Sequence, residues 1–262
     1  MKKSLLLLVL FIIGFTITAT NQVEASNTTS YGWGLPKHKT GVRPYPGKLY
    51  EDILSRHNAI YIDKLNDQNI YLTFDAGFEN GYTEMILDVM KEEKVKATFF
   101  LTGQYLEKNH DLVKRMVKEG HIIGNHTYYH PDLTKISKAE YEKDLTQFEN
   151  KYFEITNKKL QKIMRPPAGT FSDRSLQIAD ELGYYTIFWS LAYKDWEINN
   201  QKGADYAYKS VMQRVHPGAI ILLHNVSKDN AEGLKRIIVD CKKQGYKFAS
   251  LADLIMRYEL YI

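Results

Sequence analysis

Short β-type runs alternate with helical runs along most of this chain, and this alternation is the feature that most constrains its fold. Residues 69–74 form an apolar β-type run, and residues 82–94 follow with Ile86, Leu87 and Met90 on one helical face. Strands separated by helices pair in parallel, because each helix returns the chain to the start of the next strand. The same alternation predicts strands at 96–101, 121–124, 163–165, 184–190, 219–223 and 247–249, and helices at 104–119, 137–155, 172–182, 204–216, 231–244 and 251–257.

Three polar residues stand where predicted strands end. Asp75, Arg165 and His224 each come at the end of a β-type run. In parallel α/β barrels the carboxyl ends of the strands meet at one face, and the loops at that face carry the chemistry. The sequence therefore predicts that these three side chains share one site.

A histidine pair points to a hydrolytic metal site. His126 and His130 stand four residues apart, so one helical turn or a tight loop can direct both imidazoles at one point. Zinc is the default metal for imidazole ligands with open positions, and cobalt, nickel and manganese are the alternatives. By contrast, His110, His121 and His216 stand inside or beside predicted helices and strands, so we expect them to be structural or solvent-facing.

Five segments in order carry a family resemblance. They are residues 71–77, 126–130, 164–169, 188–196 and 221–225. With these segments, the chain from about residue 69 to residue 254 resembles the polysaccharide deacetylases with a NodB-homology domain, carbohydrate esterase family 4. The resemblance implies an α/β fold, a distorted (β/α) barrel of about seven or eight parallel strands.

The resemblance also implies roles for the central residues. Amide hydrolysis needs a polarised carbonyl, an activated water, a site for the oxyanion and a proton for the departing amine. His126 and His130 would hold the metal, and Asp75 would be the general base. His224 would be the general acid, and Arg165 would form an ion pair that orients Asp75.

Further positions are assigned to the substrate. The backbone N–H of Ala168 would face the oxyanion, in a loop that two prolines make stiff. Leu222 and Trp196 would line a small apolar pocket for the acetyl methyl group. Asp195 is expected to position that wall or His224.

Two positions depart from the family pattern. The first motif usually carries two adjacent acids, a base and a metal ligand, but the second position here is Ala76. The metal would then have one protein ligand fewer and would bind more weakly. The fourth motif usually begins with an acid that tunes the catalytic histidine. That position is Ala192 here, which leaves the control of the His224 pKa open.

Two segments indicate a branch of the family. Residues 75–81 and 195–203 resemble the enzymes that deacetylate N-acetylmuramic acid in peptidoglycan, associated with muramic δ-lactam in the spore cortex. The leading hypothesis is therefore a secreted, metal-dependent deacetylase that acts on muramic acid in peptidoglycan glycan strands. An N-acetylglucosamine or chitin-oligomer deacetylase is the alternative within the enzymes. A glycan-binding pseudoenzyme is the alternative outside them, because Ala76 and Ala192 remove two acids.

The N-terminus has the order of a secretory signal. Basic residues precede an apolar run from Leu5 to Ile17, and small residues follow near Ala25. We expect residues 1–25 to be a cleaved signal peptide, with an uncleaved membrane anchor as the alternative. The protein would then act outside the cytoplasm, in the cell wall or the forespore cortex space.

Two units follow the predicted signal. Residues 26–68 are rich in glycine and proline and are expected to form an extended segment packed on the barrel. Its aromatic residues, Tyr31, Trp33, Tyr45 and Tyr50, are expected to anchor it. Residues 69–262 would form the deacetylase domain.

The charge distribution limits the classes of ligand, and the cysteine content limits the possible cross-links. The net charge is +4, and the basic residues are interleaved with acids, which argues against nucleic acid as a ligand. Cys241 is the only cysteine, so no disulfide forms within the chain, and we expect it to pack on a helix as a small apolar residue. No obligate protein partner is predicted.

Overall fold

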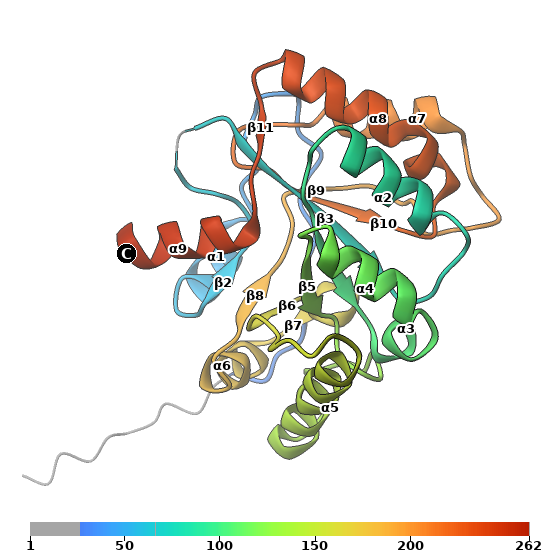
Figure 1. Cartoon of the computed structure of the whole chain (residues 1–262). Helices are drawn as coiled ribbons and strands as arrows, with labels where there is room; N and C mark the ends of the chain where they lie inside the picture. The colour runs from blue at the N-terminus through green and yellow to red at the C-terminus, as the bar shows by residue number, and fades with distance from the viewer. Residues whose placement is uncertain (1–26, 66, 262) are drawn as a thin grey trace, which may run out of the picture.

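A curled parallel sheet forms the centre of the molecule. The computed structural model describes residues 27–65 and 67–261, so the predicted signal peptide lies outside the described residues. The nine-stranded sheet has the order β2-β8-β6-β5-β4-β3-β10-β9, and β11 pairs with β3 (Figure 1). Every pairing in it is parallel. The strands are β2 (Ala59–Ile60), β3 (Asn69–Ala76), β4 (Thr98–Leu101), β5 (Ile122–Asn125), β6 (Ile163–Met164), β8 (Tyr185–Ile187), β9 (Leu191–Ala192), β10 (Ile220–His224) and β11 (Lys247–Phe248).

The connection from β8 to β9 shows how far the sheet curls. These two strands lie near opposite ends of the strand order, yet only residues 188–190 join them. A connection of this length spans at most about 14 Å. The ends of the sheet must therefore approach each other, although no ladder joins β9 to β2 in the described residues. The predicted distorted barrel is confirmed, and the single strand predicted at 184–190 is corrected, because this run leaves β8 and crosses the opening to β9.

The side chains of β3 alternate between two environments. Leu72, Phe74 and Ala76 pack in the apolar layer between the sheet and its helices. Tyr71 belongs to a second apolar cluster inside the barrel. Asp75 is on the same face of the strand as Tyr71, since neighbouring residues of a strand point to opposite sides. The carboxylate therefore points into the barrel, whereas Ala76 points toward the helices.

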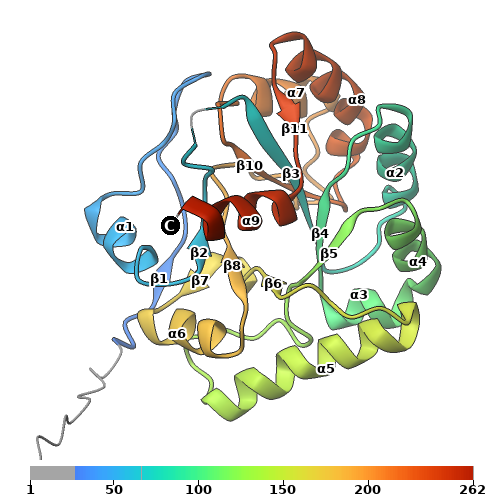
Figure 2. The same cartoon turned by 60° about the vertical axis from the view of Figure 1, so that its left-hand side comes forward.

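Helices cover the outside of the sheet. Figure 2 shows α2, α4, α5 and α6 arranged around the strands, with α9 crossing in front of them. Leu251 and Leu254 of α9 pack with Ile60 and Tyr71, so this helix covers the end of the barrel where β3 begins. The helices are α1 (Lys48–Leu54), α2 (Thr83–Glu92), α3 (Gly103–Lys108), α4 (His110–Lys118), α5 (Lys138–Thr156), α6 (Asp173–Glu181), α7 (Ala204–Met212), α8 (Lys228–Lys243) and α9 (Leu251–Tyr261).

The helix predicted at 104–119 is two helices. Asn109 separates α3 from α4, and its backbone has left the helical region, with φ −131° and ψ 44°. Its side-chain amide donates to the carbonyl of Tyr105 at 3.1 Å. Asparagine side chains compete for backbone groups in this way, which favours a break in the helix. The prediction used the spacing of apolar residues, which does not show that the Asn109 side chain competes for a backbone carbonyl.

The segment 26–68 is more structured than expected. It contains α1, the edge strand β2, and β1 (Tyr31–Gly32), which pairs antiparallel with β7 (Thr170–Phe171). Trp33 and Tyr50 pack against Phe171, as anchoring residues should. Tyr45 does not anchor the segment, because its side chain is 59% exposed.

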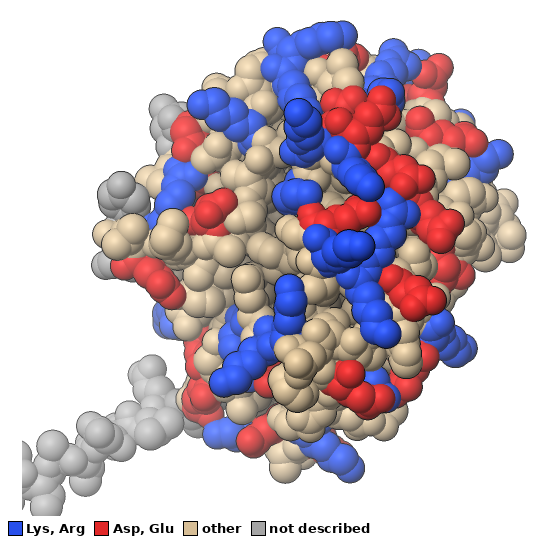
Figure 3. Space-filling view, in the orientation of Figure 1, with Lys and Arg blue, Asp and Glu red and all other residues tan. Residues whose placement is uncertain are grey.

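Several smaller expectations can be compared with the structure. Cys241 is fully buried on α8 beside Met212, as predicted. His121 and His216 are buried, which lowers the pKa of each to about 4, and His110 is exposed. Acidic and basic side chains are interspersed on the face shown in Figure 3. Among the described helices, none combines the length and apolar character needed to cross a bilayer.

His57 joins the N-terminal segment to the barrel. Its Nδ1 lies 2.7 Å from Asp180 and its Nε2 lies 3.0 Å from Asp173, and both acids belong to α6. Burial alone would lower the pKa of His57. The hydrogen bonds and the attraction of Asp180 and Asp173 outweigh burial, so the pKa of His57 lies above its ordinary value.

We predict that His57→Gln destabilises the protein more at pH 5.5 than at pH 9. A raised pKa means that the contribution of His57 is fully present below the unfolded pKa of about 6.5 and is lost as the pH rises through the folded pKa. The expected loss at low pH is about 1–2 kcal/mol, measured by urea unfolding. His110→Gln, at an exposed histidine, is the control. A loss that does not vary with pH would contradict this account of the ion pair.

Candidate active site

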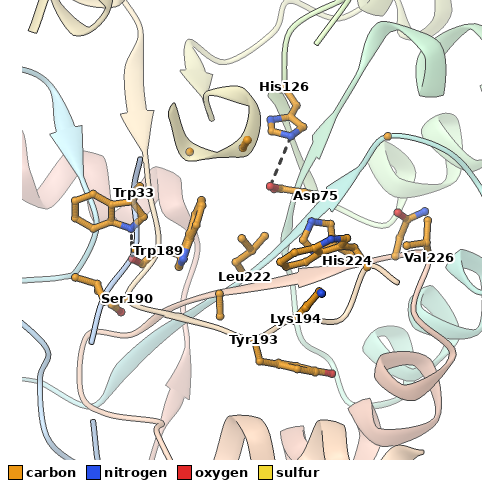
Figure 4. Close-up of a pocket in the computed structure, with 18 of the residues that line it drawn as sticks. Trp33, Asp75, His126, Trp189, Ser190, Tyr193, Lys194, Leu222, His224 and Val226 are labelled. Carbon is orange, nitrogen blue, oxygen red and sulfur yellow. Dashed lines mark hydrogen bonds and ion pairs between the residues drawn. The ribbon is translucent and has the colours of Figure 1, made fainter. Parts of the chain in front are cut away.

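A cavity of about 700 Å³ opens at the carboxyl ends of the central strands. Figure 4 shows Asp75, His126, Leu222 and His224 directed toward it from neighbouring strands and loops. The residues that line it include all but two of the predicted site residues, the exceptions being Arg165 and Asp195, which lie behind it. The lining is Trp33, Gly34, Leu35, Pro36, His38, Asp75, Gly77, Phe78, His126, His130, Ala168, Gly169, Trp189, Ser190, Ala192, Tyr193, Lys194, Trp196, Arg214, Leu222, His224, Asn225 and Val226.

Arg165 holds Asp75 from inside the barrel. Its Nη1 donates to Asp75 Oδ1 at 2.7 Å and to Thr73 Oγ1 at 3.0 Å. The guanidinium also donates to the carbonyls of Ile187 at 3.0 Å and Phe188 at 3.2 Å. A fully buried arginine needs such a complete set of partners, because an unpaired buried charge is very costly.

The ring of Phe100 supports the guanidinium. The Arg165 Cζ lies 4.1 Å from the ring centroid of Phe100. The Phe100 ring in turn packs directly on Gly124. Only glycine fits at position 124, because a Cβ there would lie 2.5 Å from the ring. Strands β3, β4 and β5 therefore cooperate to place one cation beside Asp75.

Asp75 is kept ionised by its neighbours. Burial works against its charge, but the attraction of nearby cationic groups, Arg165 above all, outweighs burial, and the pKa of Asp75 lies below its ordinary value. Its second oxygen, Oδ2, lies 3.7 Å from His126 Nε2. One carboxylate oxygen is thus committed to Arg165, and the other faces the histidine pair.

The backbone fixes the orientation of His126. Its Nδ1 lies 2.8 Å from the carbonyl oxygen of Arg165, so Nδ1–H donates and Nε2 keeps its lone pair. Burial lowers the pKa of His126 to about 4, so the ring is neutral at neutral pH. The ring of His130 lies nearly perpendicular to it, with centroids 5.0 Å apart, and burial lowers the pKa of His130 as well.

The loop that joins the two histidines adopts unusual backbone angles. Thr127 and His130 have positive φ values of 67° and 58°, which few residues other than glycine adopt. Asn125 Oδ1 accepts from Thr127 N at 2.8 Å. Asp144 accepts from the N–H groups of Tyr128 at 2.6 Å and Tyr129 at 3.0 Å. These bonds hold the strained loop, as is common at functional sites.

Sequence reasoning missed Asp144 as a supporting residue. It lies on the buried face of α5 together with Tyr141, Leu145 and Phe148. A carboxylate within the apolar stripe of a helix is a signal that the sequence does contain. It indicates a buried acid that requires partners, although it does not say which ones.

The donor set fits a divalent metal held by two imidazoles. Within residues 27–65 and 67–261, no group of three or more His, Cys, Asp or Glu side chains is arranged to hold a metal ion. However, the His126 Nδ1–H bond to a backbone carbonyl is the arrangement that metal-binding histidines usually have, with Nε2 free to coordinate. Ala76 supplies no third ligand, because its methyl group has no donor atom, and it packs in the apolar layer.

His224 stands on the strand next to Asp75. The two residues are register partners on the parallel strands β10 and β3. Asp195 accepts from the His224 N–H at 2.8 Å, and its Oδ1 lies 2.7 Å from His224 Nδ1. Asn230 donates to the other carboxylate oxygen at 2.6 Å.

Asp195 therefore controls the pKa of His224, although position 192 is alanine. Burial alone would lower the pKa of His224, but the attraction of Asp195 and its hydrogen bond outweigh burial, and the pKa of His224 lies above its ordinary value. Of the two roles expected for Asp195, the structure supports the positioning of His224. The carboxylate beside His224 therefore comes from Asp195, three residues after Ala192.

The other predicted residues lie around the same cavity. Ala168 is exposed and has a positive φ of 54°. Leu222 is buried in the floor, next to Ala192 in the register of β10 and β9. Trp196 is 50% exposed, and its ring centroid lies 5.4 Å from that of His224.

One wall of the cavity was not predicted. Residues 33–36 and His38 of the N-terminal segment line it. Trp33 is nearly buried, and its Nε1 donates to the carbonyl of Trp189 at 2.9 Å. It packs on Phe188, with ring centroids 4.7 Å apart. The residue that anchors the segment thus also shapes the site, which a sequence pattern cannot show because the contact joins distant parts of the chain.

Comparison with known proteins identifies the family. The polysaccharide deacetylase model matches residues 63–187. The peptidoglycan-N-acetylmuramic acid deacetylase PdaA of Bacillus subtilis is 44% identical over 239 residues, which cover 91% of this chain and 91% of the relative. The chain belongs to the polysaccharide deacetylase family.

Other members of the deacetylase family extend the comparison. The solved structure of Bacillus subtilis PdaA, a family 4 carbohydrate esterase, matches with a TM-score of 0.86 and covers 88% of this chain and 99% of its own. A peptidoglycan-N-acetylglucosamine deacetylase of Bacillus cereus is 36% identical over 72% of this chain and 69% of the relative. A family 4 pseudoenzyme from Bacillus anthracis is 33% identical, with a TM-score of 0.70 over 75% of this chain and 68% of its own.

The cavity of this deacetylase brings complementary groups together. It contains an ionised carboxylate, two neutral imidazoles and a third imidazole whose protonated form is stabilised. When neighbouring groups have pKa values shifted in opposite directions, one can act as a base and the other as an acid at the same pH. The arrangement is chemically competent for hydrolysis of an amide.

We predict that Asp195→Asn lowers the pKa of His224. Removing the carboxylate takes away the charge that stabilises the imidazolium, so deprotonation occurs at lower pH. The measurement is an NMR titration of the histidine rings. Glu197→Gln is the matched control, because Glu197 lies on the same loop and pairs with exposed Lys194 at 2.5 Å. An unchanged His224 titration in the Asn variant would show that Asp195 does not control this group.

Proposed function

We propose that this protein is an extracytoplasmic, metal-dependent deacetylase that removes the acetyl group from N-acetylmuramic acid in peptidoglycan. The observation that carries the proposal is the pairing of Asp75 with His224 across β3 and β10, each held in its charged form by a separate buried partner. Few structural roles would require two such arrangements at one cavity.

Asp75 and His224 divide the proton transfers. Ionised Asp75 takes the proton from the attacking water, and Arg165 keeps it oriented and anionic. Protonated His224 gives its proton to the departing sugar nitrogen, while Asp195 holds the imidazole in position. Their register partnership on adjacent strands lets one bound amide face both groups.

His126 and His130 are the proposed metal ligands. When a divalent cation is bound there, the chemistry supplied is polarisation of the acetyl carbonyl and acidification of water. Zinc is the leading choice for imidazole ligands, with cobalt, nickel or manganese as alternatives. Two histidines without a third protein ligand predict weaker binding than a complete three-ligand site.

The remaining predicted residues contact the acetyl group. The N–H of Ala168 faces the developing oxyanion, and the positive φ at this residue turns the peptide of a short, proline-stiffened loop. Leu222 and Trp196 provide the apolar wall for the methyl group. Such a wall excludes water from the reacting amide.

The muramic specificity rests on similarity. Identity to the muramic acid deacetylase PdaA is 44%, against 36% for the N-acetylglucosamine deacetylase. Action on peptidoglycan requires a location outside the cytoplasm, which agrees with the signal peptide expected at residues 1–25. The muramic δ-lactam of the spore cortex is the proposed setting.

A pseudoenzyme is the second candidate. The similarity to a family 4 pseudoenzyme and the absence of an acid at position 76 favour it. The retained Asp75–Arg165 and His224–Asp195 pairs favour catalysis. Deacetylation of N-acetylglucosamine in peptidoglycan or chitin oligomers is the alternative within the enzymes.

We predict that Asp75→Asn lowers kcat for acetate release by about 100-fold or more. Asparagine keeps the shape of the side chain but cannot accept the proton, and it also leaves Arg165 without its counter-ion. Asp88→Asn, at a surface acid paired with Arg115, is the control. Thermal unfolding of both variants shows whether the fold survives. More than a tenth of the wild-type kcat in a folded Asp75→Asn variant would exclude Asp75 as the base.

The substrate is tested with metal-stripped and metal-restored protein. Peptide-free muramic glycan strands and chitin oligomers are incubated with each, and mass spectrometry locates the sugar that loses acetyl. Metal-dependent loss from the muramic residue is expected. Loss of acetyl only from glucosamine would show that the protein is an N-acetylglucosamine deacetylase. Glycan binding without loss from either sugar would favour the pseudoenzyme.

A further inference from the structure

Arg214 occupies a part of the cavity that the proposed chemistry does not use. It follows α7 and its C-cap residue Gln213, and its partly buried side chain lines the cavity together with Ala192. Ala192 is the register partner of Leu222, which forms the floor beside the catalytic residues. Arg214 therefore belongs to the same binding space as Asp75 and His224.

The guanidinium of Arg214 is held by backbone carbonyls alone. Its Nε donates to Ser210 O at 3.0 Å, and its Nη1 donates to Ala192 O at 2.8 Å. Among residues 27–65 and 67–261, no carboxylate forms an ion pair with it, and its Nη2 has no hydrogen-bond partner. Burial lowers the pKa of Arg214.

The other strong cations, Arg165 behind the cavity and Lys194 in its lining, are already neutralised. Arg165 pairs with Asp75 at 2.7 Å, and Lys194 pairs with Glu197 at 2.5 Å. A partly desolvated guanidinium without an acid is unfavourable in the free protein, because water no longer solvates it fully. Arg214 thus carries an uncompensated positive charge into the cavity.

The N-terminal segment holds the backbone of Arg214 in place. His38 Nε2 lies 2.9 Å from Arg214 O. Thr40 donates to Met212 O at 2.9 Å, and Gly41 N donates to Val215 O at 2.7 Å. These contacts bind the segment along the end of α7. These contacts hold the backbone of Arg214, and the bonds to Ser210 O and Ala192 O hold its guanidinium, so the cation is positioned before a ligand arrives, which reduces the entropy cost of binding.

We propose that Arg214 binds a carboxylate of the glycan substrate and so selects sugars that carry a muramyl side chain. The planar guanidinium suits a carboxylate, and its unused Nη2 points to a free donor for one of the two oxygens. Neutral N-acetylglucosamine offers no such group. The carboxylate has two possible sources, the lactyl group of a peptide-free muramic residue and the acids of a peptide stem. This inference rests on the proposed deacetylase function.

Three forms of one glycan separate the possibilities. The first is peptide-free muramic strands, the second is the same strands with the lactyl carboxylate methyl-esterified, and the third is strands that keep their peptide stems. For the wild-type protein, kcat/KM should be higher on the first form than on the ester if the lactyl group is bound. A preference for the third form over the ester would assign the carboxylate to the stem.

Arg214→Gln should abolish the preference for the carboxylate form. The ratio of kcat/KM between acid and ester is expected to fall about tenfold or more, mainly through KM, because a charge-assisted hydrogen bond is lost. Arg214→Lys, which keeps the charge, should retain part of the preference. Arg236→Gln is the matched control, because this arginine pairs with Asp205 outside the cavity. Thermal unfolding checks that each variant is folded.

An equal effect of Arg214→Gln on acid and ester, or no effect on either, would overturn the proposal. Calorimetric binding of the acid and ester strands to wild-type and Arg214→Gln protein tests it independently of turnover. If the wild-type protein released no acetate but still bound the acid form more tightly through Arg214, the deacetylase function would fail and the carboxylate site would stand. Equal binding of both forms by the wild-type protein would exclude the site.

Discussion

The ion pair between Arg165 and Asp75 is the interaction on which the rest of the site depends. The guanidinium is fully buried inside the barrel, where it contacts β3, the end of β8 and the ring of Phe100 on β4. Its own carbonyl accepts from His126, so the same residue orients Asp75 and one histidine of the pair. A buried charge of this kind tolerates no missing partner, which makes the site rigid as a unit.

The two halves of the site are built on the same plan. Asp75 is an anion stabilised by a buried cation, and His224 is a cation stabilised by the buried carboxylate of Asp195. Neighbouring strands bring the halves together in register. Opposite charges that are stabilised separately can remain close without neutralising each other by proton transfer, and a cavity between them can polarise an amide from both sides.

The loops and the N-terminal segment complete what the strands begin. Positive φ values at Thr127, His130 and Ala168 turn short loops back over the strand ends, and Asp144 holds one of those loops from the outer helix. Residues 33–36 and His38 close the remaining side, and His38 contacts the backbone carbonyl of Arg214. The central charged residues are therefore held by the strands of the barrel, while the loops and the N-terminal segment give the cavity its shape.

The sequence by itself determined the order of elements, the parallel sheet and the positions of Asp75, His126, His130, Arg165 and His224. These follow from local periodicity and from residues placed at strand ends, which a linear pattern records. It did not show the break at Asn109 or the strands β1, β2, β7 and β9, because these two-residue strands lie outside the regular alternation of strand and helix that revealed the equally short β6 and β11.

Only the tertiary structure decided which charges meet. The sequence contained both Ala192 and Asp195, but the pairing of Asp195 with His224 depends on how the loop after β9 folds back toward the end of β10. Likewise, Ala76 is adjacent to Asp75 in sequence and yet points to the opposite side of the sheet. Trp33 and Arg214 reach the cavity from segments outside the motifs. Contacts between distant segments set burial, and burial sets the pKa values and charges that make the cavity a site.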